Sequence, residues 1–531
     1  MTYRLYISFV FAFLSLPAFS DDFIVDGLGY TILDSELFDH DYPVVEVSNT
    51  TIDKSLLQLP SIEVPSTVTW DKTEYTVIGI GYEAFRGVGT GRFTLPYTLE
   101  YIDDYAFKET YFKDWGNFVP GFSIGTIIPK GVYLIGRGVF ENSDHFYSLN
   151  FLNENWPPAV DYIPDRMFYD SYNAVVSRFV DIPEGIKRIG DRAFFHTAIG
   201  HYELIMDSLH DTYREDLKLP NSLVEIGPYA FGECNFLMNA RMSANVKTIG
   251  DGAFYHCDRL VNVMLNEGLE TIGSNAFMQC HTLNDIPALP FSLKSIGAAA
   301  FRDCYSFCRV HIPESSMTVL SDSLFYGCDN LESITIPANI RRINSQAFGN
   351  CYALRTVKVM GDLEFIDIDA FTIRSAFNCY SLRDFYCHSS SVPKIHPAAF
   401  CAGWSLQKQN EDDMQVIYNG RAYYIPLTFE FDVYDFDGNY EYSKEYPYDI
   451  YVRNATRHVP KALVSKYRTT FPWSMFGSIV AIEDEEADGI FHTVADRLSP
   501  RDAIYDMNGR RLNEMHRGIN IINGRKILVR P

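Results

Sequence analysis

Phenylalanine returns along most of the chain at a nearly constant interval, each time after a small or apolar residue. From Phe231 to Phe371 the steps are 23, 23, 24, 24, 23 and 23 residues. The same context holds thirteen phenylalanines in all: Phe85, Phe107, Phe140, Phe168, Phe194, Phe231, Phe254, Phe277, Phe301, Phe325, Phe348, Phe371 and Phe400. A fixed period of this size indicates an internal repeat, and it takes precedence over a division into globular domains.

Each repeat combines a strand pattern with a return segment. In LESITIPANIRRINSQAFGNC, residues 331–351, Ile334 and Ile336 alternate with polar residues as in a short strand, and Pro337 ends that strand. Phe348 follows on the return leg. A unit this short cannot bury its own apolar face, so its neighbours must stack on it. The pattern predicts a mainly β solenoid of thirteen units, with a parallel sheet and short helical or 3₁₀ turns.

A cysteine occupies the third position after the phenylalanine in six consecutive units: Cys234, Cys257, Cys280, Cys304, Cys328 and Cys351. The earlier units hold Val88, Thr110, Ser143, Ser171 and Thr197 in that slot. A ladder of such residues does not converge on a tetrahedral zinc ion. Disulfides between neighbouring coils stay open as an alternative, although in-register side chains keep their β-carbons about 4.8 Å apart, beyond the preferred ~3.8 Å. We therefore predict buried, reduced thiols with a weak S–H donor.

The repeat resembles that of the BspA-like leucine-rich repeat family, a group of bacterial surface and secreted proteins of the Bacteroidota type. The family pattern is a strand ending in Pro, then V-x-x-I-G-x-x-A-F-x-x-C-x-x-L, and it is met at Leu223–Leu237, Val246–Leu260, Leu269–Leu283 and Leu293–Phe307. The resemblance covers about residues 77–404 and implies a leucine-rich repeat solenoid. The units of Phe140, Phe168 and Phe194 depart from the pattern by long insertions.

The segments outside the repeat suggest an exported protein. Residues 1–20 have the basic start, apolar stretch and small-residue end of a signal peptide. Residues 21–76 are expected to cap the first coil, and 405–484 to form an irregular β hairpin and a closing segment. Residues 485–531 read as a small β tail. This tail resembles the C-terminal sorting signals of type IX secretion cargo, which would make the export machinery a partner.

Charge narrows the choice of partners. With 45 basic and 68 acidic residues, the chain has a net charge of −23, which opposes nucleic acid binding. No stretch after the leader is long and apolar enough for a transmembrane segment. This balance of acidic and basic residues fits a soluble protein that contacts other proteins.

Motifs that imitate catalytic or ligand sites have simpler explanations. GFSIG at 121–125 precedes a repeat strand instead of the helix that a nucleophile elbow needs. DFDGNYE at 435–441 has tyrosine where a calcium loop needs glycine. His256, His281 and His311 lie in different units with no Asp or Glu at ligand spacing, so we interpret them as surface residues. The sequence thus predicts no catalytic residues, no cofactor and no metal site.

Two surfaces could hold a protein ligand, for instance a host matrix protein. Alternation within the strands places one row of side chains on the outer face of the sheet: Met264, His311, Thr335 and Lys358. Two insertions are rich in aromatic residues, which favours protein contacts: Phe146, Tyr147, Phe151, Trp156, Tyr162, Tyr202 and Tyr213. These aromatics could also pack on the solenoid itself. The function predicted is non-enzymatic protein binding or adhesion at the cell surface; a passive surface scaffold and a secreted hydrolase with an unrecognised site are the alternatives.

Overall fold

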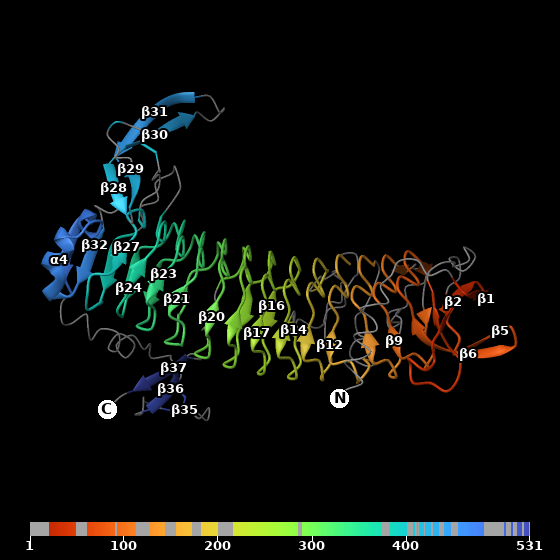
Figure 1. Cartoon of the computed structure of the whole chain (residues 1–531). Coiled ribbons are helices and arrows are strands. Elements are labelled where there is room, and N and C mark those ends of the chain that lie inside the picture. The colour runs from red at the N-terminus through yellow and green to blue at the C-terminus, as the bar shows by residue number, and fades with distance from the viewer. Residues whose placement is uncertain are drawn as a thin grey trace, which may run out of the picture.

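The chain winds into an elongated stack of coils (Figure 1). The computed structural model describes residues 21–48, 61–90, 93–112, 128–143, 156–171, 182–199, 216–284, 289–372, 382–400, 407–408, 411, 414–418, 420–425, 428–434, 440–447, 455–482, 504–505, 511–512, 518–522 and 525–529. The predicted signal peptide lies outside these residues. No helix among the described residues is both long enough and apolar enough to span a bilayer.

One wall of the stack consists of two-residue strands that pair in parallel from coil to coil, and the pairing divides them among three successive sheets. The isoleucines Ile226, Ile249 and Ile272 lie side by side in this register and are buried. The strands are β9 (Tyr101–Ile102), β11 (Leu134–Ile135), β12 (Tyr162–Ile163), β13 (Arg188–Ile189), β15 (Glu225–Ile226), β17 (Thr248–Ile249), β19 (Thr271–Ile272), β20 (Ser295–Ile296), β21 (Val319–Leu320), β23 (Arg342–Ile343), β25 (Phe365–Ile366) and β27 (Lys394–Ile395).

A second wall, which we call the sheet face, carries the other set of parallel strands, some of which precede a proline as the sequence predicts. It contains β4 (Ile62–Glu63), β8 (Phe93–Thr94), β14 (Asp216–Lys218), β16 (Asn239–Arg241), β18 (Asn262–Met264), β22 (Ser333–Ile336), β24 (Thr356–Val359), β26 (Asp384–Cys387), β32 (Thr456–Val459) and β33 (Ser478–Ala481). A further parallel pair joins β7 (Gly89–Thr90) and β10 (Tyr111–Phe112). The predicted mainly β, parallel solenoid is confirmed, with two parallel walls where the sequence predicts one sheet.

The thirteen phenylalanines form one continuous column through the stack. Each ring is stacked on the next with centroids 5.1–5.7 Å apart, from Phe85 on Phe107 to Phe371 on Phe400. Phe254 and Phe277 have no exposed surface. The spacing of the sequence is therefore the spacing of the coils, and the count of thirteen units is confirmed.

The return leg differs from the prediction of short helical or 3₁₀ turns. From the repeat of Phe85 to that of Phe348 it is a hydrogen-bonded turn in which the residues two before and two after the phenylalanine adopt left-handed φ values, such as Arg192 (52°) and His196 (53°) around Phe194. Helical dihedrals are negative, so two such residues within five positions prevent a helix. The backbone N–H of Phe194 donates instead to the carbonyl of Ala230 in the next coil. The turns thus add a third ladder between coils.

The cysteine slot is a buried hydrogen-bonding position. Each ladder thiol donates to the carbonyl oxygen of the phenylalanine in the preceding coil; the Sγ–O distance is 3.1 Å from Cys257 to Phe231 and from Cys280 to Phe254. Ser171 makes the equivalent bond to Phe140 at 2.9 Å. All six ladder cysteines are free and buried, which confirms the prediction of thiols that act as weak donors. Burial raises the pKa of the Cys280 thiol to about 12, so it stays protonated.

The two ends of the solenoid are closed by different means. At the N-terminal end, β1 (Phe23–Val25), β2 (Leu28–Leu33) and β3 (Val44–Val47) pair antiparallel, and β3 then pairs in parallel with β6 (Thr73–Ile80), which β5 (Thr67–Trp70) flanks. At the C-terminal end, β32 and β33 extend the second wall, and the last coil is covered by η2 (Lys461–Leu463), α4 (Val464–Thr469) and η3 (Trp473–Met475). From VPKALVSKYRTTF, residues 459–471, the sequence predicts a helix at 462–469, and α4 lies within that range.

A fully buried arginine lies at the centre of the C-terminal cap. The Cζ of Arg457 is 3.1 Å from the ring centroid of Trp473 and 4.1 Å from that of Tyr467, and Phe385 and Phe476 complete the aromatic box. No described residue accepts a hydrogen bond of good geometry from its guanidinium nitrogens. Burial lowers the pKa of the group to about 10. The cation–π contacts, worth about 2 kcal/mol or more when desolvated, offset a desolvation penalty of several kcal/mol.

Replacing Arg457 with methionine is therefore expected to keep or raise the stability of the cap, by up to a few kcal/mol, because it removes the buried charge and fills most of the volume. Arg457→Ala serves as the control, since it removes the charge but leaves a cavity. Urea unfolding of both variants measures the difference. A methionine variant clearly less stable than the parent would show that the charge itself stabilises the cap.

Two further sets of strands lie outside the repeats. β28 (Met414–Tyr418) pairs antiparallel with β29 (Arg421–Ile425), and β30 (Thr428–Tyr434) with β31 (Tyr440–Pro447); both hairpins project from the C-terminal end of the stack (Figure 1). The second hairpin is the one that the alternation at 429–433 predicts. The tail forms an antiparallel sheet of β34 (Ile504–Tyr505), β35 (Arg511–Leu512), β36 (Gly518–Ile522) and β37 (Arg525–Val529).

Candidate binding surface on the sheet face

The predicted outer row does face away from the core. In β18 the buried Val263 separates the exposed Asn262 and Met264, and Met264 is 50% exposed. Thr335 of β22 and His311 are exposed, and Lys358 of β24 is half-buried. The alternation of buried and outward residues thus works as the sequence predicts.

The structure divides this row into two groups. Met264 pairs with Arg241 in the three-stranded sheet β14–β16–β18. Thr335 pairs with Lys358 in a different sheet of five strands, and His311 lies between the two sheets, outside both. The four predicted residues therefore do not form one continuous site.

A more compact cluster of side chains extends from Lys358 across the neighbouring strands of the five-stranded sheet. The register aligns Thr335, Lys358, Tyr386, His458 and Val480 on neighbouring strands, and we call this set the C-terminal column. The Nζ of Lys358 lies 5.0 Å from the ring centroid of Tyr386. The rings of Tyr386 and His458 stack at 4.0 Å, nearly parallel. The column thus presents a cation beside a stacked aromatic pair.

An acidic side chain completes the cluster. Asp384 lies on the same strand as Tyr386, two residues before it, and its Oδ1 is 3.0 Å from Nε2 of His458. This contact holds the imidazole in its stack on Tyr386. A fixed aromatic pair flanked by lysine and aspartate can contact apolar and charged groups of a partner together, and tyrosine is among the residues enriched in protein interfaces.

The sequence analysis missed Tyr386, His458 and Asp384. Tyr386 follows the inward Phe385 in LRDFYCH, so the same alternation could have found it. His458 could not be found that way, because 74 residues separate it from Asp384 and residues 401–454 interrupt the period. Only the pairing of β26 with β32 brings the two together.

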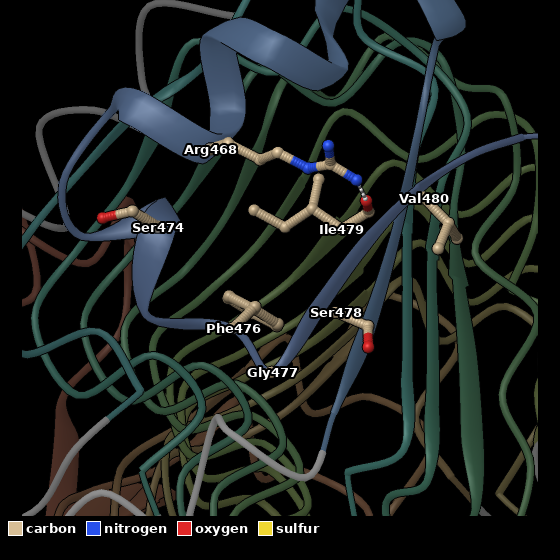
Figure 2. Close-up of a pocket in the computed structure, with 7 residues that line it drawn as sticks. All are labelled: Arg468, Ser474, Phe476, Gly477, Ser478, Ile479 and Val480. Carbon is tan, nitrogen blue, oxygen red and sulfur yellow. Dashed lines mark hydrogen bonds between the residues drawn. The ribbon is translucent and has the colours of Figure 1, made fainter.

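A shallow hollow of about 290 Å³ adjoins the end of the C-terminal column (Figure 2). The Nη2 of Arg468 donates to the carbonyl oxygen of Ile479 at 2.9 Å and so covers part of the exposed edge of β33. Phe476 supplies a buried apolar surface. The residues lining the hollow are Arg468, Ser474, Phe476, Gly477, Ser478, Ile479 and Val480.

The aromatic residues of the first insertion that the structure describes turn toward the solenoid. Trp156 is half-buried and its Nε1 donates to the carbonyl oxygen of Val160 at 2.8 Å. The hydroxyl of Tyr162 donates to the carbonyl oxygen of Ile135 at 3.0 Å, and both rings pack against the core. These two side chains therefore fix residues 156–162 to the solenoid, and Tyr162 does so through a hydrogen bond to the preceding coil. The other predicted aromatics lie outside the described residues: Phe146, Tyr147, Phe151, Tyr202 and Tyr213.

The interpretation of the three histidines needs a correction. Asp258 lies between His256 and His281: its Oδ1 is 3.5 Å from Nε2 of His256 and 2.7 Å from Nδ1 of His281. The prediction that no Asp or Glu stands at ligand spacing is therefore wrong for His256 and His281. The stacking of neighbouring coils brings these two histidines together although they are 25 residues apart in the sequence. His311 is not part of the group.

Comparison with known proteins identifies the repeat. Residues 55–116, 123–204, 206–288 and 287–407 match the BspA type leucine rich repeat region, in six copies. These segments make up more than half of the 531 residues. A search of curated protein sequences finds no match.

Solved structures of leucine-rich repeat proteins resemble the chain over most of their length. A leucine-rich repeat protein from Bacteroides ovatus is 20% identical with a TM-score of 0.44, over 87% of this chain and 100% of that one. A leucine rich cell surface protein from Faecalibacterium prausnitzii is 21% identical (TM-score 0.40; 71% and 97%). The pneumococcal vaccine antigen PcpA is 17% identical (TM-score 0.40; 70% and 97%). At these TM-scores they add no argument about function.

Proposed function

The chain belongs to the BspA type leucine-rich repeat family, and from this premise we propose that it is an exported, non-enzymatic protein that binds another protein at the cell surface. The repeat is a scaffold for protein binding, because it offers one long, regular surface instead of a deep cleft. The apolar leader at residues 1–20 supports export, and the tail sheet β34–β37 agrees with the proposed sorting signal of a bacterium of the Bacteroidota.

The C-terminal column is the observation that carries the proposal. Lys358, Tyr386 and His458 lie side by side on three strands that the core holds in place. Tyrosine and basic side chains fixed in this way lose little conformational entropy on binding, which makes them effective interface residues. The hollow beside Val480 extends the surface for a protruding side chain of the partner.

The two aromatic insertions are proposed as a secondary contact region. Trp156 and Tyr162 face the solenoid, so the contact with a partner is assigned to the other aromatic residues of the two insertions. The ligand class proposed is a protein, and a host matrix protein is the specific candidate.

Direct binding tests the function. The labelled full chain is applied to immobilised fibronectin, laminin and collagen, and to an array of glycans as a second ligand class. Saturable binding to a protein is expected. Binding to glycans alone would contradict a protein ligand, and turnover of a polymer in a panel of hydrolase substrates would contradict the non-enzymatic role.

A further inference from the structure

The turns of two neighbouring coils bring His256, Asp258 and His281 into one cluster at the surface. One nitrogen of each imidazole and one carboxylate oxygen all lie within 4.8 Å of one another. A tetrahedral zinc ion with bonds of about 2.0–2.2 Å separates its ligand atoms by roughly 3.3 Å. The 3.5 Å between Asp258 Oδ1 and His256 Nε2 is close to that value, whereas the 2.7 Å between Asp258 Oδ1 and His281 Nδ1 is shorter, so a small shift of the Asp258 carboxylate away from His281 would accommodate the ion.

From this arrangement we infer that His256, Asp258 and His281 form a binding site for a divalent transition-metal ion such as Zn²⁺. Two imidazoles and one carboxylate suit zinc and its neighbours in the periodic table, whereas Mg²⁺ and Ca²⁺ select oxygen ligands. Three protein ligands leave a coordination position open, which a water molecule or a side chain of a bound protein fills. The inference is independent of the proposed function.

The scaffold holds the ligands before the ion arrives. Cys257, which lies between His256 and Asp258, and Cys280, which precedes His281, are both fixed by their thiol bonds to the preceding coil. The ring of His281 stacks on Tyr305 at 4.9 Å and 3°, which sets its plane. Ligands on rigid backbone with one ring already oriented lose little entropy on binding a metal.

The carboxylate has an oxygen available for the ion. Asp258 Oδ1 is shielded from solvent and, despite lying 2.7 Å from His281, receives no hydrogen bond of acceptable angle from the described residues. A misdirected N–H stabilises the oxygen only weakly, even at this distance. The neighbouring Arg259 stacks on the ring of Phe236, so its side chain is directed to that contact.

Calorimetric titration of the untagged full chain with ZnCl₂ tests the site. All proteins carry Cys308→Ser, because Cys308 is an exposed free thiol. Saturable binding of one equivalent is expected, with no heat from MgCl₂. His281→Gln and Asp258→Asn should each weaken zinc binding at least about 10-fold, since even residues outside the coordination sphere cost 10–100-fold in other sites. His311→Gln, an exposed histidine outside the cluster, should leave it unchanged.

A second measurement separates lost ligands from lost folding. Zinc should raise the thermal unfolding midpoint of the parent and of His311→Gln, but not that of His281→Gln, while all the proteins should unfold alike without metal. Equal zinc affinity in the parent and in His281→Gln would overturn the inference. So would the lack of saturable binding by the parent.

Discussion

Aspartate at position 257 is expected to unfold the central coils, whereas serine at the same position is expected to be accepted. Cys257 has no exposed surface, and its thiol donates to the carbonyl oxygen of Phe231. A carboxylate there would meet that carbonyl oxygen and no cation, and burying an unpaired charge costs several kcal/mol. Serine can donate to the carbonyl as Ser143 does to Phe107 at 2.9 Å, so its cost should stay within about 1 kcal/mol.

Urea unfolding followed by circular dichroism measures this contrast. A repeat array can unfold in stages, so the midpoint of the first transition is the quantity to compare. Cys257→Asp should lower that midpoint strongly or prevent folding, and Cys257→Ser should stay near the parent. A similar loss of stability in both variants would mean that this position requires sulfur. The prediction that serine is accepted there would then be wrong.

Truncating Phe254 to alanine is expected to cost about 3–5 kcal/mol, the range for buried phenylalanines. The ring has no exposed surface and stacks on Phe231 at 5.4 Å and on Phe277 at 5.3 Å. Removing it leaves a cavity that both neighbouring coils line. Because those coils are held by ladders in the two walls and the turns, they cannot collapse freely into the gap.

Phe291→Ala is the matched control for this truncation, because Phe291 is 62% exposed. Its cost should remain within about 0.5 kcal/mol, as for ordinary surface substitutions. The free energies of unfolding of the two variants, measured in urea, are compared with that of the parent. Similar losses for both phenylalanines would mean that the column of rings does not stabilise the stack.

Most of the solenoid follows from residues that repeat in sequence. The phenylalanine period gives the number of coils, and the strand before each proline gives one wall, because inward positions must be apolar in every unit. The variation of the cysteine slot among Val, Thr, Ser and Cys predicts a small buried residue. The alternation within strands likewise predicts which side chains face outward.

Other features have no repeating side chain to mark them. The left-handed positions around the phenylalanine hold residues as different as Arg192, Ser323 and Gly252, because the backbone ladder imposes the conformation and no single side chain is required there. The C-terminal column was missed because β26 and β32 pair across a long interruption. The cluster of Asp258 with two histidines was missed because contacts between coils join residues about one period apart, which spacing rules for a single segment do not consider.

The affinity of one double variant shows whether the C-terminal column binds a protein. The binding affinity of the double variant Lys358→Ala with Tyr386→Ala is compared with that of the parent. The ligand is whichever of fibronectin, laminin or collagen binds the parent. Lys130→Ala with Tyr97→Ala is the matched control, since both side chains are exposed in early coils. The column variant should bind at least about 10-fold more weakly, equal to about 1.4 kcal/mol, and the control should bind like the parent. A column variant that binds as tightly as the parent would contradict the account.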